Sequence, residues 1–160
     1  MKRKLLFAPG DAGSKNYRIP AIITAADGSL VVATDKRKNN QGDLPEDIDV
    51  VIRRSEDGGI TWSEPQTIAE GTGARRGFGD AGLVHTTEEN GLLCIFVGGE
   101  GIFNNSSPSN PTRTYVCKST DNGKTWSAPR DITEQLYGTA CLLPRDRGGM
   151  LLSVLREMDY

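Results

Sequence analysis

The chain has 160 residues, with 19 Lys and Arg against 21 Asp and Glu, so its formal net charge is −2. This near balance leaves no electrostatic footprint for nucleic acid or for an anionic membrane surface. The 19 Gly and 8 Pro exceed average usage and indicate many tight turns between short strands. We therefore expect a globular chain that binds no nucleic acid.

The N-terminal segment, residues 1–10, starts with basic residues but has only four apolar residues before Pro9. A signal peptide needs an apolar stretch of about 7–15 residues, and a membrane helix needs about 20. The sequence as written therefore predicts a cytoplasmic chain without a membrane span. A start site placed inside a longer gene would look the same.

Three β-hairpins follow one another along the chain. Apolar runs flank short Asp-Gly, Asn-Gly or Gly-Gly turns, a pattern that is typical of tight hairpins. A third strand and the start of a fourth are expected after each of the first two hairpins, and a weak helical period is found over 131–136. The predicted hairpins cover 21–33, 83–96 and 141–154, the third strands 49–54 and 114–118, and the fourth strands begin near Gln66 and Arg130.

The pattern S-x-D-x-G-x-T-W occurs at 55–62 and again, 64 residues later, at 119–126. In such a turn the carboxylate can accept backbone N–H bonds, the glycine can adopt a positive φ, and the hydroxyl groups can tie the turn ends. A calcium loop starting at Asp121 would need glutamate where Ile132 stands. We therefore interpret the motif as structural, with its Trp packed between sheets. Its residues are Ser55, Asp57, Gly59, Thr61, Trp62, Ser119, Asp121, Gly123, Thr125 and Trp126.

Four strands in about 60 residues make one blade of a β-propeller, so the predicted fold class is all-β. We expect blade 1 over about 17–70, blade 2 over about 79–134 and the start of a third blade over about 137–156. A ring closes with at least about four blades. The sequence therefore predicts part of a longer domain, whose open strand edges would favour self-association.

The three cysteines and the single histidine, His85, leave no zinc site and no histidine-dependent catalytic triad. Each cysteine lies in an apolar run, which indicates reduced, buried thiols. A Cys94–Cys117 bridge between neighbouring strands is the alternative. Cys141 completes the set, and we expect no metal ion and no cofactor.

The segment Tyr17-Arg18-Ile19-Pro20, followed by the two S-x-D-x-G-x-T-W motifs, resembles the bacterial-type exo-sialidases, or neuraminidases. The resemblance runs from about Leu6 to about Gly138. It implies a six-bladed propeller and the hydrolysis of terminal α-ketosidic sialic acid from sialylated glycans. The implied reaction retains the anomeric configuration and uses a tyrosine nucleophile.

The resemblance also implies site residues. Arg18 corresponds to one of three arginines that hold the substrate carboxylate, a task suited to a guanidinium fork. Arg37 corresponds to a pocket arginine near the sugar's 4-position. Asp43 corresponds to the aspartate that serves as acid and base, and Asp47 and Asp49 are the alternatives on the same loop.

In the second blade, Asp80 corresponds to the aspartate that takes the N-acyl amide, with Phe78 beside it. Three of these assignments have a simpler alternative. Arg18 would then be part of a structural ion pair, Asp43 a member of an idle polar loop, and Asp80 a turn residue between glycines. We interpret Arg75 and Arg76 as a solvated loop.

The nucleophilic tyrosine, its partner glutamate and the other two carboxylate-binding arginines belong to later blades of the family, and no part of this chain matches them. We therefore expect an N-terminal sialidase fragment with low activity of its own. Two alternatives come from other classes. One is a non-catalytic propeller that binds a glycan or protein partner, and the other is an inactive, truncated gene product.

Overall fold

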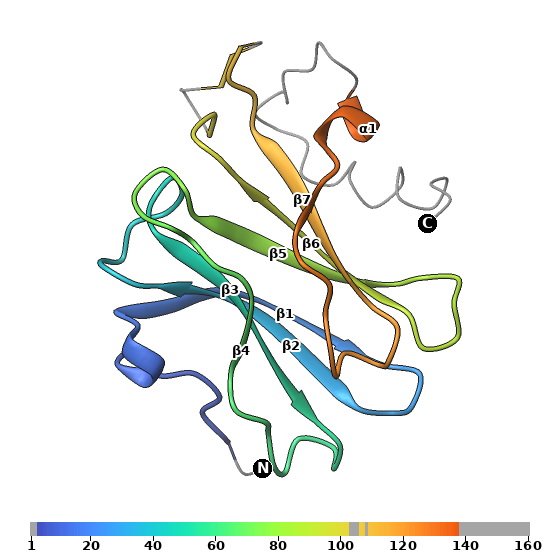
Figure 1. Cartoon of the computed structure of the whole chain (residues 1–160). Helices are drawn as coiled ribbons and strands as arrows, with labels where there is room; N and C mark the ends of the chain where they lie inside the picture. The colour runs from blue at the N-terminus through green and yellow to red at the C-terminus, as the bar shows by residue number, and fades with distance from the viewer. Residues whose placement is uncertain (1–2, 103–105, 108, 138–160) are drawn as a thin grey trace.

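The structure is a computed structural model that describes residues 3–102, 106–107 and 109–137. Two four-stranded antiparallel sheets follow each other along the chain (Figure 1). The first sheet consists of β1 (Asn16–Thr24), β2 (Leu30–Arg37), β3 (Ile48–Ser55) and β4 (Gln66–Ala69). The second consists of β5 (Phe78–His85), β6 (Leu92–Gly98), β7 (Arg113–Ser119) and β8 (Arg130–Asp131).

In each sheet, strands that are consecutive in the chain lie next to each other, which is the arrangement of a propeller blade. The first two predicted hairpins and the strands that follow them are therefore confirmed. The third hairpin, 141–154, lies outside the described residues. A short 3-10 turn (Asp11–Gly13) precedes β1, and the predicted helical period corresponds to α1 (Thr133–Tyr137). Among the described residues, no helix is long and apolar enough to cross a membrane.

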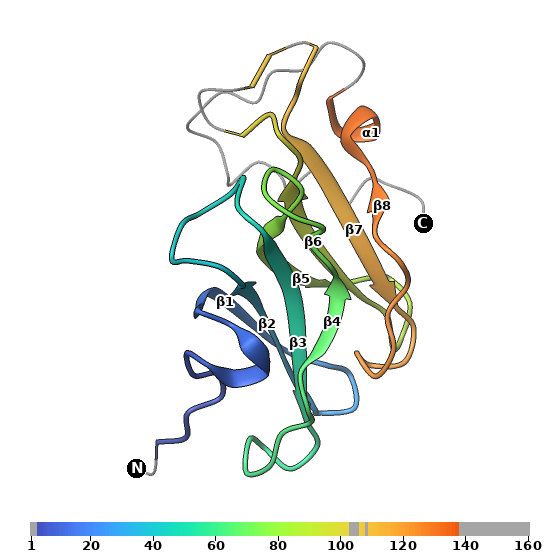
Figure 2. The ribbon, with the colours of Figure 1, turned by 60° about the vertical axis from the view of Figure 1, so that its left-hand side comes forward.

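The two sheets pack face to face, and β5 contacts β1, β2 and β3 (Figure 2). Apolar side chains at alternate positions of the strands fill the space between the sheets, as the period of two requires. Removal of this apolar surface from water is the main force that holds the blades together. The buried core between the blades consists of Ala25, Val31, Ala33, Val50, Ile52, Ile68, Ala69, Ala81, Leu92, Cys94, Phe96 and Cys117.

The two repeated motifs form nearly identical turns. Asp57 accepts hydrogen bonds from the backbone N–H of Thr61 at 2.8 Å and from its hydroxyl at 2.5 Å. The Ser55 hydroxyl donates to Asp57 and accepts from the N–H of Gly59, whose φ is +90°. The hydrogen bonds from Thr61 lower the pKa of Asp57 to about 2. Asp121 makes the corresponding contacts with Ser119 and Thr125 in the second motif, so the two repeats share one pattern of local hydrogen bonds.

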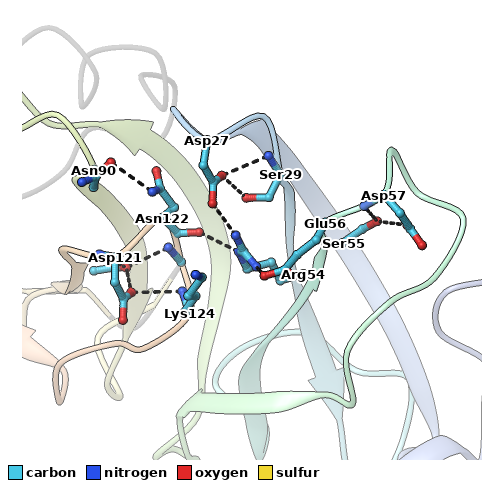
Figure 3. Close-up of polar contacts among 12 residues, drawn as sticks. Asp27, Ser29, Arg54, Ser55, Glu56, Asp57, Asn90, Asp121, Asn122 and Lys124 are labelled. Carbon is cyan, nitrogen blue, oxygen red and sulfur yellow. Dashed lines mark hydrogen bonds and ion pairs between the residues drawn. The ribbon is translucent and has the colours of Figure 1, made fainter.

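Arg54 connects the first blade to the second motif (Figure 3). Its Nε donates to the carbonyl of Asn122 at 2.9 Å, and its Nη2 lies 2.6 Å from Asp27. Its Nη1 contacts Glu56. Because Trp126 also packs against the core between the blades, the turns with the motifs contribute to blade docking as well as to local structure.

Cys94 and Cys117 face each other across β6 and β7, yet both are free and buried. Burial raises the pKa of Cys117 to about 12 and that of Cys94 well above its ordinary value. The prediction of reduced, buried thiols is therefore confirmed for these two residues, and the alternative of a bridge between them is wrong. Cys141 lies outside the described residues.

Candidate active site

The predicted site lies at the end of the strands where the β2–β3 loop and the start of β5 meet. Because the strands are antiparallel, the S-x-D-x-G-x-T-W turns, which follow β3 and β7, lie at the opposite end of the strands. The two regions are therefore separated by the length of the strands. Residues of the motif serve the fold at one end of the strands, and Arg37, Asp43 and Asp80 gather at the other.

The innermost strand of each blade has a bulge at the site. The register with the neighbouring strand shifts between Arg18 and Ala21 in β1, and between Gly79 and Gly82 in β5. Within each bulge one non-glycine residue has a positive φ, 55° for Ile19 and 58° for Asp80. A positive φ is unfavourable for any residue with a side chain. It is found where the surrounding structure enforces it, often at functional sites.

Asp35 is the most deeply buried acid of the site. It lies near the end of β2 with no exposed surface, and its Oδ1 accepts the backbone N–H of Asp80 at 3.0 Å. Its Oδ2 has no hydrogen-bond partner among the described residues. Burial and the nearby Asp80 carboxyl raise the pKa of Asp35 to about 7, against an ordinary value of 3.8.

Arg37 is almost fully buried two residues further along β2. Its Nη1 donates to the carbonyls of Gln41 and Gly42 at 2.7 and 2.8 Å. Its Nη2 lies 3.0 Å from Asp43 Oδ1 and 3.9 Å from Asp35 Oδ2, as ion pairs without hydrogen-bond geometry. The buried cation therefore holds the start of the loop through two carbonyls and lies between two carboxyl groups.

Asp43 lies on the β2–β3 loop and is partly open to solvent, with 38% of its side chain exposed. The next residue, Leu44, is buried against Ile48 and Ile102, with Val97 beside them. Ile102 follows β6, so this loop of the first blade is anchored on the second. Asp43 is therefore held between a fixed guanidinium and a buried apolar side chain, which restricts where its carboxyl group can lie.

The loop meets the connection between the blades along a second contact. Lys38 lies 2.8 Å from Asp47 and 3.0 Å from Asp49, and it donates to the carbonyl of Gly71 at 2.6 Å. These partners raise the pKa of Lys38 despite its partial burial. Asp47 on the loop and Asp49 at the start of β3 are thus both paired with this lysine, whereas Asp43 is paired with Arg37.

Asp80 brings the third carboxyl group to the site. Partial loss of solvent and the nearby Asp43 raise its pKa, while Arg37 and Arg18 act in the opposite direction. Oxygens of Asp35, Asp43 and Asp80 all lie within 4.8 Å of one another. One cation could contact all three, but Arg37 already supplies positive charge next to two of them, so we assign no metal site here.

The structure brings together four of the five predicted site residues. Arg37, Asp43 and Asp80 interact as described, and Arg18 is the cross-strand neighbour of Asp35 and acts on the pKa of Asp80. Phe78 instead packs edge-on against Phe96 and Tyr115, at ring distances of 5.6 and 5.0 Å. Its predicted contact with a ligand stays a prediction. Arg75 and Arg76 are exposed, as expected for a solvated loop.

Comparison with known proteins identifies the family. The chain matches the BNR repeat-like domain over residues 28–154. It is 36% identical to a sialidase of Bacteroides fragilis over 142 residues, which cover 79% of this chain and 26% of that protein. It is 35% identical to a sialidase of Micromonospora viridifaciens over 136 residues, which cover 79% of this chain and 21% of that protein.

A solved structure agrees with this result. The Hadza microbial sialidase Hz136 superposes with a TM-score of 0.69 at 30% identity, over 79% of this chain and 28% of that one. The chain therefore belongs to the bacterial-type sialidases with BNR repeats, and its two sheets are part of a β-propeller. It spans about a quarter of the length of the curated relatives named above.

Proposed function

We propose that this chain forms part of the sugar-binding site of an exo-α-sialidase, a glycoside hydrolase that releases terminal sialic acid from sialylated glycans. The observation that carries the proposal is the 3.0 Å ion pair between Arg37 and Asp43, which has two further carboxyl groups within 4.8 Å. A cluster of charged groups this close together lowers the stability of the folded chain, and such clusters concentrate at functional sites.

The open groups of the site suit a sugar. The side chain of Asp43 is 38% exposed and Asp80 is exposed, whereas Arg37 and Asp35 are buried. Open carboxylates can accept hydrogen bonds from the hydroxyl and amide groups of a sugar. Arg18 is exposed and has no ion-pair partner within the described residues, so it is available to the carboxylate of a sialic acid.

In the proposed reaction, Asp43 protonates the leaving oxygen and later deprotonates water, with retention of configuration. The nucleophile in this reaction would be a tyrosine that is not among the described residues of this chain. Tyr17 donates its hydroxyl to the carbonyl of Asp11, and Tyr115 packs in the aromatic cluster with Phe78, so neither is placed for attack. We therefore expect this chain to bind sialosides but to hydrolyse them slowly at most.

The test measures saturation transfer by NMR from the purified chain to 3′-sialyllactose, with lactose as the reference, and release from a fluorogenic α-sialoside. We expect saturation transfer from the chain to the sialic acid ring, and we expect this transfer to be weaker in Arg18→Ala. Asp47→Asn, which changes an acid bound to Lys38, serves as the matched control. Equal transfer to lactose and to sialyllactose would contradict the proposal and favour a propeller that binds another partner.

A further inference from the structure

The function of Asp35 is not explained by its role in the fold. A carboxyl group with no exposed surface is expected to have its charge paired or to be neutral. Among the described residues Asp35 has one hydrogen bond, from the N–H of Asp80 to Oδ1, and one long ion pair, 3.9 Å to Arg37. Because Oδ1 is occupied as an acceptor, the proton of the neutral form belongs on Oδ2.

Charged and titratable groups approach Asp35 from β1, from β2 and the loop after it, from β5 and from β6, while β3 places the apolar Val50 beside it. Arg18 is its cross-strand neighbour on β1, Arg37 follows on β2, and Asp43 and Asp80 approach from the loop and from β5. The buried thiol of Cys94 on β6 is also close enough to be affected by its charge. With all three acids ionised, three negative charges would share the two arginines.

Arg37 is the group for which two of these acids compete. The same nitrogen, Nη2, is 3.0 Å from Asp43 and 3.9 Å from Asp35, and Nη1 is held by two loop carbonyls. A neutral Asp35 leaves Nη2 to Asp43. An ionised Asp35, which has little solvent to stabilise its charge, attracts the guanidinium away from Asp43.

We propose that Asp35 is a positioning residue that carries a proton in the working protein and thereby keeps Arg37 paired with Asp43. Ionisation of Asp35 as the pH rises through neutrality releases this arrangement and adds negative charge next to Arg37 and Asp80. The raised pKa of about 7 agrees with the geometry. The inference deepens the proposed function, on which the consequence for sialic acid rests, but the protonation itself does not depend on it.

Close packing around Asp35 holds its carboxyl group in a fixed position. A Cβ atom at Gly79 would lie 2.9 Å from Asp35 Oδ2, so the absence of a side chain at this position lets β5 lie directly on the carboxyl group. The positive φ of Asp80 then directs its N–H to Oδ1. The bulge in β5 and the acid in β2 therefore fit each other.

The test follows the carboxyl carbons of aspartate and the guanidinium signals of Arg37 by NMR in the intact chain between pH 4 and pH 9, without sugar. We expect Asp35 to titrate with a midpoint near 7 and the Arg37 signals to shift with the same midpoint. Asp35→Asn retains the acceptor for Asp80 but cannot ionise, so this step in the Arg37 signals should vanish. Asp49→Asn, at another buried acid, should leave the step unchanged.

Titration of Asp35 below pH 5, or Arg37 signals that keep their step in Asp35→Asn, would overturn the inference. Neither result concerns sialosides, so the proposed function is judged separately by the binding of 3′-sialyllactose. We expect this binding to weaken above pH 7 in the parent chain and to lose this pH dependence in Asp35→Asn. A purely structural role of Asp35 would not produce this difference, because the asparagine keeps the same hydrogen bond.

Discussion

Replacing Asp35 by asparagine should change how the stability of the chain depends on pH. In the folded chain the pKa of Asp35 is about 7, against an ordinary value of 3.8 that applies when the chain is unfolded. The folded state therefore binds more protons than the unfolded state between about pH 4 and pH 7. The stability contributed by the neutral group is fully present below this range and is lost as the pH rises through it.

The size of this effect follows from the two pKa values. A difference of one in pKa corresponds to about 1.4 kcal/mol, so Asp35 removes about 4 kcal/mol from the free energy of unfolding between pH 4 and pH 8. Asparagine has a similar shape and no titration in this range. We expect Asp35→Asn to match the parent chain near pH 4 and to be more stable by about 4 kcal/mol at pH 8.

Urea unfolding followed by tryptophan fluorescence measures this difference at several pH values. Asp49→Asn is the matched control, because Asp49 is also buried but is paired with Lys36 and Lys38. Loss of that paired charge should destabilise the chain at pH 8, opposite in sign to Asp35→Asn. A difference between Asp35→Asn and the parent that stays constant from pH 4 to pH 8 would refute the reasoning.

Three further predictions concern the support of the site. Leu44→Ala should lower the free energy of unfolding by about 2–3 kcal/mol, because it leaves a cavity against Ile48 and Ile102, and denaturant titration would detect it. Gly77→Ala should disturb the loop of Asp43, since its Cβ would lie 2.0 Å from the carbonyl oxygen of Glu46. Gly82→Ala, with no atom nearer than 4.0 Å, should be tolerated, and a comparison of thermal midpoints checks both. Asp57→Asn should reduce the loss of stability in acid between about pH 4 and pH 2, because the low pKa of Asp57 ties its contribution to ionisation, as acid titration by circular dichroism would show.

The local features of the fold were predictable from the sequence. The hairpin turns and the S-x-D-x-G-x-T-W motifs depend on residues that are neighbours in the chain, and the hydrogen bonds within each motif span at most four positions, as for Ser55 with Gly59. The strands that they connect then follow from alternating apolar residues. The pair of Arg37 and Asp43 was also accessible, because the two residues are only six positions apart, at the end of β2 and on the loop after it.

The long-range contacts that support the site could not be predicted from the sequence in this way. Asp35 meets Asp80 across a separation of 45 residues, and Lys38 meets Gly71 across 33. The packing of β5 on the first sheet creates the first contact, and the connection between β4 and β5 supplies the second. The one available indication was a charged residue directly after the buried run Val31–Thr34, where an unpaired acid is unfavourable. The positive φ of Ile19 had no indication in the sequence, because isoleucine disfavours it.

The anchor beside Asp43 has a consequence for the order in which the protein is made. Leu44 belongs to a loop of the first blade, but its partner Ile102 is synthesised 58 positions later. On a ribosome, the first blade can pair all of its strands while its acidic loop still lacks this contact. Production of the first blade alone would keep Arg37 and Asp43 and yet leave the loop of Asp43 without its anchor. The geometry of the site therefore depends on the second blade as well as on the charged residues of the first.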